Sequence, residues 1–323
     1  MSDVLVSISD LRVSFRTPRG RLQVVRGVDV ELHGGGITGV LGESGSGKTV
    51  TLNALLRVFD RETGVIDSGS AVYRGRDLLA LTEPELRGIR GRCISYVFQN
   101  PAQAMNPYLS VGRQMRLAGR VHGRHHDRET VLGTLRDVGI DHPELVHDMY
   151  PFELSGGLNQ RVMVALAIVL RPEVLIADEP TSFIDATLRR RILDLFMEIN
   201  TRSGTTVVIV THDFDVARLA CDRLVIMYGG LVMEEGSTPE ILDDPLHPYT
   251  RALISCTESL DSNDGVLYSL PGVPLAPHEF ADECPFAARC ADVRDACRER
   301  IPPTVTIGSR RVRCVRYVSG ANP

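Results

Sequence analysis

The sequence predicts an α/β fold with buried strands, and three observations predict it. A glycine-rich loop lies between a short apolar run, 37–41 (ITGVL), and a segment with apolar residues at helical spacing, 51–59. Two further apolar runs, 174–177 and 205–210, are typical of strands that are buried on both faces. Before the loop, 4–15 and 22–32 alternate between apolar and polar residues, which predicts an antiparallel β layer.

The glycine-rich loop has the pattern G-x-x-x-x-G-K-T, which is typical of phosphate-binding loops. Its residues are Gly42, Glu43, Ser44, Gly45, Ser46, Gly47, Lys48 and Thr49. Glycines let the backbone turn successive N–H groups toward phosphate oxygens, and the following helix N-terminus adds a positive partial charge. We expect Lys48 to reach the β- and γ-phosphates and Thr49 to bind Mg²⁺.

Length and composition limit the number of domains and the class of protein that the chain can form. The 323 residues suffice for one main domain plus an appendage, and the net charge of −5 gives no general attraction to nucleic acid. The first ten residues lack the pattern of an export signal. The longest apolar run, 162–170, has 9 residues, against the roughly 20 that a membrane-spanning helix needs. We therefore expect a soluble protein, which leaves contact with a membrane protein open.

Phe15 is the only aromatic residue before the loop. It is suited to stacking on a nucleotide base, but an isolated aromatic residue in a strand more often belongs to the core. Further along, 64–73 and 94–98 are predicted strands, and 78–90 is a predicted helix. A helical region follows from 111 to about 147. We expect its five histidines to lie on the solvated surface, at positions His122, His125, His126, His142 and His147.

Ser155, Gly156 and Gly157 precede a predicted helix that ends near Leu170. Exposed amides at a helix start form an anion site, so this segment is a second candidate for phosphate binding. The Ser-Gly-Gly sequence alone is weak evidence, because it is common in turns.

Acidic residues and a histidine follow two of the buried strands. Asp178 and Glu179 come directly after 174–177, where one carboxylate suits Mg²⁺ and the other suits a base that polarises water. His212 follows the strand 205–210, at the end of a sheet where α/β proteins bind ligands. A hydrogen-bonded core histidine is an equally good interpretation of His212 alone. A hairpin is predicted at 224–234.

From Ile241 the sequence is rich in proline and is predicted to be mostly loop. Four cysteines fall here with the spacing C-x5-C-x6-C-x16-C, at Cys284, Cys290, Cys297 and Cys314. Clustered thiols without an export signal suggest a tetrathiolate metal site. Structural zinc prefers tighter pairs, whereas an iron–sulfur cluster is compatible with this spacing, so the spacing leaves the metal undecided.

Taken together, these motifs resemble an ATP-binding cassette (ABC) transporter ATPase subunit. Residues 4 to about 240 contain the family's whole ordered set of motifs, although Leu158 stands where glutamine or methionine is common. The resemblance implies a P-loop NTPase (RecA-like) core with an antiparallel β subdomain and a helical subdomain at about 100–165. It also implies that 1–240 form the nucleotide-binding domain and 241–323 an extension.

The resemblance assigns roles to individual residues. In addition to the loop at 42–49, nucleotide contacts are implied for Phe15, Gln99, Ser155, Gly156, Gly157, Gln160 and Asp185. Mg²⁺ ligation is implied for Thr49, Gln99 and Asp178. Glu179 is implied to be the catalytic base, and His212 to contact the γ-phosphate.

Further stretches resemble the dipeptide/oligopeptide importer group, namely 98–107, 150–160, 247–250 and the four-cysteine tail. Related nickel-chelate and opine importers share parts of this pattern, so another small solute remains an alternative cargo. In this group the tail cysteines are associated with a [4Fe–4S] cluster, with Zn²⁺ as the alternative. We expect the tail to lie in a different domain from the ATP site, so that loss of a cluster ligand would unfold the tail and spare much of the ATP site.

The resemblance implies that this chain forms a head-to-tail dimer with a second ATPase subunit, either a copy of itself or a paralogue. This dimer would bind two permease subunits at the cytoplasmic face of the membrane. A separate extracytoplasmic solute-binding protein would select the cargo. Three other classes fit less well. DNA-repair ATPases carry a long coiled coil, translation-associated cassette proteins carry two cassettes, and a non-hydrolysing regulatory subunit would not need Glu179 and His212.

Overall fold

The computed structural model describes residues 3–18, 20–60, 62–182, 184–261 and 269–318. Twelve strands form two sheets within these ranges. Their bounds are β1 (Val4–Thr17), β2 (Gly20–His33), β3 (Ile37–Leu41), β4 (Gly64–Tyr73), β5 (Arg76–Asp77), β6 (Ile94–Val97), β7 (Val174–Asp178), β8 (Thr206–Thr211), β9 (Arg223–Tyr228), β10 (Leu231–Ser237), β11 (Val305–Ile307) and β12 (Arg310–Val312). The smaller sheet has the order β2-β1-β4-β5 and is antiparallel.

The larger sheet has the order β11-β12-β10-β9-β3-β8-β7-β6. Strands β6, β7, β8, β3 and β9 pair in parallel, so their carboxyl ends meet on one side. Neighbouring residues of β8 enter different core clusters: Val207 and Ile209 face one, and Val208 and Val210 face the other. Burial on both faces explains why residues 207–210 of this strand form an unbroken apolar run.

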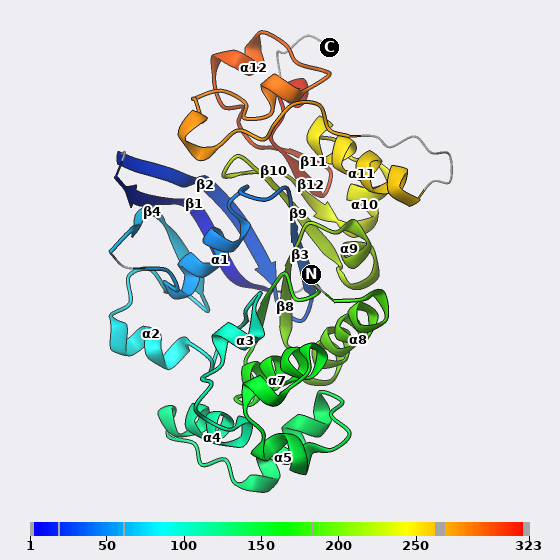
Figure 1. Cartoon of the computed structure of the whole chain (residues 1–323). Coiled ribbons are helices and arrows are strands. Elements are labelled where there is room, and N and C mark those ends of the chain that lie inside the picture. Colours follow the sequence, from blue (N-terminus) through cyan, green and yellow to red (C-terminus); the bar gives the residue numbers. More distant parts are fainter. Residues whose placement is uncertain (1–2, 19, 61, 183, 262–268, 319–323) are drawn as a thin grey trace.

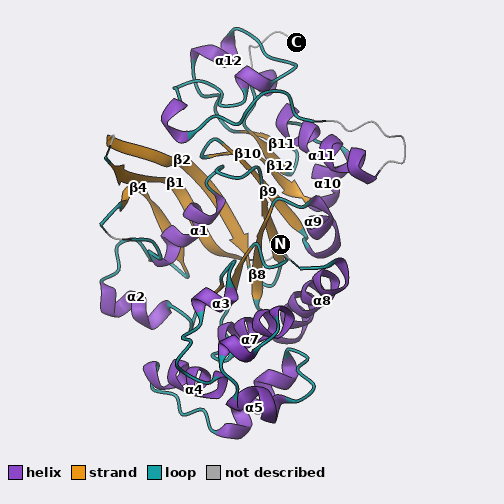
Figure 2. Cartoon of the chain, in the orientation of Figure 1, coloured by secondary structure: helices purple, strands orange, loops and turns teal. Residues whose placement is uncertain are grey.

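Helices cover the larger sheet and form a separate layer at the end of the molecule opposite the cysteine tail (Figure 1, Figure 2). Their bounds are α1 (Lys48–Leu56), α2 (Glu83–Ile89), α3 (Pro101–Ala104), α4 (Val111–Val121), α5 (Arg128–Asp137), α6 (Pro143–Asp148), α7 (Gly156–Ile168), α8 (Ala186–Ser203), α9 (Phe214–Ala220), α10 (Thr238–Asp243), α11 (Pro248–Asp261) and α12 (Ala296–Glu299). The α/β fold class and the helical region near 100–165 are therefore as predicted.

Some boundaries differ from the prediction. The region 111–147 is three helices, because Gly123 and Gly139 adopt positive φ angles of 68° and 73° just after α4 and α5 end. The segment 78–90 becomes helical only at Glu83, where Thr82 and Glu85 form a capping box.

The prediction that all five histidines of this region lie on the surface is wrong for two of them. His126 and His147 are buried, with exposed fractions of 8% and 4%. His147 contacts Arg116 through Nε2 at 2.8 Å and Asp148 through Nδ1 at 2.5 Å. Both rings lie against a glycine of α4, since a Cβ atom at Gly112 or Gly119 would collide with them. The small size of these glycines creates the space that buries the rings.

The tail is more regular than predicted. Its first part is the 14-residue helix α11, and β11 and β12 extend the larger sheet. β12 pairs with β10 through Glu234–Val312 and Glu235–Arg311. The tail is therefore continuous with the main sheet, and does not form an independent unit beside it.

Candidate functional site

The predicted phosphate-binding loop connects β3 to α1 and is held in a tight curl. Gly42 has a φ of 147°, and a Cβ atom there would lie 2.1 Å from the carbonyl oxygen of Met227. Gly45 and Gly47 also have positive φ angles, of 80° and 98°. Only glycine fits the close approach at Gly42, and all three glycines readily adopt the positive φ angles that the curl requires.

Lys48 lies inside this curl. Its Nζ donates to the carbonyl oxygens of Gly42 at 2.7 Å and Glu43 at 2.9 Å, and contacts the Ser46 hydroxyl at 3.4 Å. The residue is only 6% exposed, and this burial lowers the pKa of Lys48, opposed by nearby carboxylates. The ammonium group is therefore positioned by the loop backbone at the place where the motif binds phosphate.

Asp178 and Thr49 meet at the end of β7, as predicted for a magnesium site. The Thr49 hydroxyl donates to Asp178 Oδ1 at 2.9 Å, and the Tyr96 hydroxyl donates to Oδ2 at 2.9 Å. Asp178 is 6% exposed, and burial raises its pKa against the effect of these two hydrogen bonds. A hydroxyl and a carboxylate oxygen are ligands that Mg²⁺ prefers. Tyr96 was missed, because it lies inside a predicted strand and its partner Asp178 is 82 positions away in the chain.

Glu179 lies where the carboxyl ends of β6, β7 and β8 come together. Gln99, after β6, donates to its Oε2 at 2.9 Å, and His212, after β8, contacts its Oε1 through Nδ1 at 3.3 Å. Ser182, which the sequence did not single out, donates to Oε2 at 2.8 Å. Glu179 has a φ of 44°, a strained conformation for a residue with a side chain. Three polar side chains and local strain thus fix this carboxylate beside Asp178.

The second anion segment lies apart from the loop. Ser155 caps α7 and accepts a 3.4 Å hydrogen bond from the Leu158 amide, leaving Gly156 exposed beside it. Within the described ranges, no hydrogen bond joins Ser155, Gly156 or Gly157 to residues 42–49. Figure 1 draws α7 among the lower helices and α1 beside the smaller sheet. One chain therefore does not bring the two anion segments together.

Three further residues that were predicted to contact the nucleotide lie in different environments. Asp185 caps α8 and accepts from the Leu188 amide at 2.9 Å. Gln160 is only 5% exposed, and its Nε2 has no hydrogen-bond partner among the described residues. It is therefore not accessible at the surface, unlike Ser155 and Gly156. Phe15 packs edge-on against Phe59, with ring centroids 6.1 Å apart, and is partly buried against the core.

All four tail cysteines line one small cavity, with a volume of about 10 Å³. Burial raises the pKa of Cys284 to about 12, and it also raises the pKa values of Cys290 and Cys314. Within the described part of the chain, no three His, Cys, Asp or Glu side chains are grouped closely enough to hold a metal ion. The four cysteines therefore surround one cavity, but their side chains are not arranged to bind a single metal ion.

The tail also contacts the phosphate-binding loop. Arg289 forms an ion pair with Glu43, and the Tyr249 hydroxyl accepts a hydrogen bond from the Glu43 amide. The tail and the phosphate-binding loop are therefore in direct contact. Little in the sequence indicates these contacts, because Glu43 and Arg289 are 246 positions apart.

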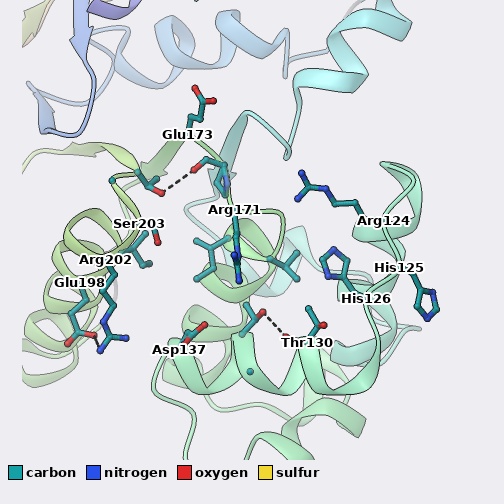
Figure 3. Close-up of a pocket in the computed structure, with 18 residues that line it drawn as sticks. Arg124, His125, His126, Thr130, Asp137, Arg171, Glu173, Glu198, Arg202 and Ser203 are labelled. Atoms are coloured by element: carbon teal, nitrogen blue, oxygen red, sulfur yellow. Dashed lines mark hydrogen bonds and ion pairs between the residues drawn. The ribbon is translucent and has the colours of Figure 1, made fainter. Parts of the chain in front are cut away.

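A further cavity, of about 1080 Å³, lies elsewhere (Figure 3). It is lined by parts of α5, α8 and the loop after α4. Its charged or titratable lining residues are Arg124, His125, His126, Asp137, Arg171, Glu173, Glu198 and Arg202. It shares no residue with the predicted nucleotide site, and cations and carboxylates are mixed around it. It therefore does not offer the single sign of charge that a phosphate group requires.

Two family descriptions match the chain. "ABC transporter" matches residues 25–182, and "Oligopeptide/dipeptide transporter, C-terminal region" matches residues 233–297. The first match contains the loop at 42–49 together with Ser155, Asp178 and Glu179. The second contains the tail up to Cys297.

Individual proteins are similar over nearly the whole chain. The dipeptide transport ATP-binding protein DppD of Bacillus subtilis is 38% identical, over 94% of this chain and 92% of its own length. The oligopeptide transport ATP-binding protein OppD of Salmonella typhimurium is 36% identical, over 97% of this chain and 93% of its own length.

Among solved structures, the ATP-binding cassette MJ0796, a dimer in a post-hydrolysis state with ADP and Pi, superposes with a TM-score of 0.65. It is 26% identical, over 72% of this chain and 98% of its own length. Across the described residues, no helix has the length and apolar character needed to cross a membrane.

Proposed function

The chain belongs to the ABC transporter family, and on this premise we propose that it is the ATP-hydrolysing subunit of a membrane importer of dipeptides or oligopeptides. The observation that carries the peptide assignment is the match of residues 233–297 to the oligopeptide/dipeptide transporter C-terminal region. The names of the relatives DppD and OppD support the same cargo class.

The phosphate groups of ATP would lie in the curl of 42–49. Loop amides and the start of α1 supply hydrogen-bond donors there, and Lys48 supplies a positive charge. The present partners of the Lys48 ammonium group are neutral oxygens of the loop, so it remains available to phosphate oxygens. These features support nucleotide binding at this loop.

Thr49 and Asp178 fit a magnesium ion, because a hydroxyl and a carboxylate oxygen lie 2.9 Å apart at the carboxyl ends of the strands. Gln99 lies on the neighbouring strand end and is the third residue that we assign to this ion. Bound Mg²⁺ would neutralise charge on the phosphate oxygens. The Tyr96 hydroxyl holds the Asp178 carboxylate in place for this role.

We assign Glu179 as the base that polarises the attacking water. Its carboxylate is oriented by Gln99, Ser182 and His212, and it is adjacent to Asp178 in the chain. A carboxylate held in this way accepts a proton from water without first having to reorganise. His212 is 63% exposed, so it is free to contact the γ-phosphate.

The complete site requires a second ATPase subunit. The separation of Ser155 from the loop within one chain supports a head-to-tail dimer, in which the α7 start of each chain faces the loop of the other. The similar cassette MJ0796 is itself a dimer, which supports a second subunit. We further propose two permease subunits, which hold the protein at the cytoplasmic face of the membrane, and an extracytoplasmic solute-binding protein. Closure on ATP and opening after hydrolysis would then drive the permease.

The peptide assignment is tested by uptake. A strain that lacks this chain is expected to lose uptake of labelled di- and oligopeptides, and the wild-type chain should restore it. Lys48→Ala should not restore uptake, because the loop loses its phosphate-binding cation. Intact peptide uptake together with lost nickel-chelate or opine uptake would contradict the cargo class.

For the tail we propose a [4Fe–4S] cluster on Cys284, Cys290, Cys297 and Cys314. The cavity that the four cysteines share supports it, as does the chemistry of a four-thiolate set. Each thiolate of such a cluster binds a different iron, so the cysteines need not converge on one point. When bound, the cluster would cross-link a tail that has a small core of its own.

Metal analysis tests this assignment. Anaerobically purified protein is expected to contain about four irons per chain and to absorb visible light. Cys297→Ser should lower both signals, whereas Cys93→Ser, outside the tail, should leave them unchanged. Stoichiometric zinc without iron would overturn the cluster but keep the tetrathiolate site. Absence of metal, with all four thiols open to alkylation in folded protein, would overturn both.

A further inference from the structure

Glu43 places a carboxylate in a loop that is built to bind anions, and the tail covers this carboxylate. Arg289 binds it at two points, with Nη1 to Oε2 at 2.7 Å and Nη2 to Oε1 at 3.1 Å. The Arg289 side chain is 4% exposed, and that of Glu43 is 22% exposed. This is a bidentate, largely desolvated ion pair, which is the strong form of an arginine–carboxylate contact.

Arg289 is itself rigidly held. Its Nε donates to the Pro271 carbonyl oxygen at 2.9 Å, and Nη1 also donates to the Tyr228 hydroxyl at 3.1 Å. The guanidinium carbon lies 5.7 Å from the centre of the Tyr228 ring and 5.9 Å from that of Phe286. The guanidinium group therefore has its orientation fixed before it meets Glu43.

A second tail residue binds the same loop position. The Glu43 amide donates to the Tyr249 hydroxyl at 2.9 Å. Tyr249 is fully buried and packs against Phe286, with ring centroids 5.2 Å apart. The Glu43 carbonyl oxygen accepts from Lys48 Nζ at 2.9 Å. The side chain and amide of Glu43 are thus held by the tail, while its carbonyl group holds the phosphate-binding lysine.

The same tail segments form the cysteine cavity. Phe286 and Cys290 line it, and Arg289 lies between them in the chain. His247 also lines the cavity, two positions before Tyr249. Arg289 and Tyr249, which both hold Glu43, therefore lie only one or two positions along the chain from residues that line the cavity.

We propose that Arg289 and Tyr249 are positioning residues for the phosphate-binding loop, and that through them the cysteine-rich tail sets the affinity for nucleotide. Arg289 neutralises a carboxylate that would otherwise repel the phosphates, and Tyr249 fixes the backbone of the loop. The inference rests on the proposed nucleotide site, which it extends from the cassette to the tail.

A double-mutant cycle tests the electrostatic part. ATP dissociation constants are measured by competition with a fluorescent ATP analogue, and thermal unfolding is recorded on the same samples. Arg289→Met should weaken ATP binding about tenfold or more, because the Glu43 carboxylate is left unpaired near the phosphates. Arg289→Met combined with Glu43→Gln should recover most of this loss. Arg289→Lys should lie between wild type and Arg289→Met, because a lysine keeps the charge but loses the two-point contact.

Two more variants complete the experiment. Arg310→Met removes a tail arginine that pairs with Asp244 and does not contact the loop, so its ATP affinity should equal that of wild type. Tyr249→Phe removes only the hydroxyl oxygen that holds the Glu43 amide, and it should weaken ATP binding about threefold. This variant keeps the test decisive if Arg289→Met does not fold.

The outcomes separate this inference from the proposed function. If wild-type protein does not bind ATP, the proposed function fails. If wild type binds ATP and Lys48→Ala does not, but folded Arg289→Met and Tyr249→Phe bind as tightly as wild type, only the present inference is overturned. It is also overturned if Glu43→Gln fails to improve binding in the Arg289→Met background, since the effect of Arg289 would then not act through Glu43.

Discussion

Glu179→Gln is expected to lower ATP hydrolysis by about 10²- to 10⁴-fold, the usual contribution of a general base, while ATP binding persists. Glutamine matches glutamate in size, so Gln99, Ser182 and His212 keep a polar partner at this position. The substitution removes the carboxylate oxygen that accepts a proton from water. The measurements are steady-state phosphate release and equilibrium binding of ATP to the same preparation.

The variant should also accumulate as a closed dimer with ATP, visible as a shift in size-exclusion chromatography, because the step that reopens the dimer is blocked. Glu198→Gln is the matched control. It removes an exposed carboxylate of α8 that pairs with Arg202 at 3.8 Å and lines a cavity beside Glu173 and Thr205, which precede β7 and β8. Wild-type turnover by Glu179→Gln would show that another group activates the water.

Mixing two inactive variants is expected to restore hydrolysis. Lys48→Ala damages the loop, and Ser155→Arg blocks the α7 start, so each variant alone should be nearly inactive. A mixed dimer has one site that combines an intact loop from one chain with an intact α7 start from the other. Random pairing of equal amounts should therefore recover about a quarter of the wild-type sites.

The physical basis of this prediction is the separation of Ser155 from residues 42–49 within one chain. Two separately prepared batches of Lys48→Ala, mixed in the same way, serve as the control and should remain inactive. Full hydrolysis by Ser155→Arg alone would contradict sites shared between chains. If the natural partner is a paralogue, the same substitutions are placed in the corresponding motifs of the two different subunits.

The positions of some candidate site residues follow from the local sequence. The loop at 42–49 and the pair Asp178–Glu179 follow from a strand and the turn that ends it. The meeting of Gln99 and His212 at Glu179 follows from a general property of parallel sheets, whose strand ends lie together.

Residues whose role depends on distant packing were missed. Tyr96 is one of several apolar or aromatic residues of β6, and only the fold reveals that its hydroxyl reaches Asp178. Arg289 is one of many arginines in the tail, and its partner is set by how the tail folds back. His147 was misjudged for a related reason, since the space that buries it comes from Gly112 on another helix.

The pairing of β12 with β10 has a consequence for how the molecule can be divided. A chain cut after 240 would leave β10 as an edge strand with unpaired backbone groups, which favours aggregation. It would also strip the fully buried Glu234 carboxylate of the backbone amides of Leu246 and His247 that now solvate it. The smallest soluble fragment that contains the cassette therefore ends well beyond the cassette's last motif, and truncation of the tail is not a neutral way to simplify this protein.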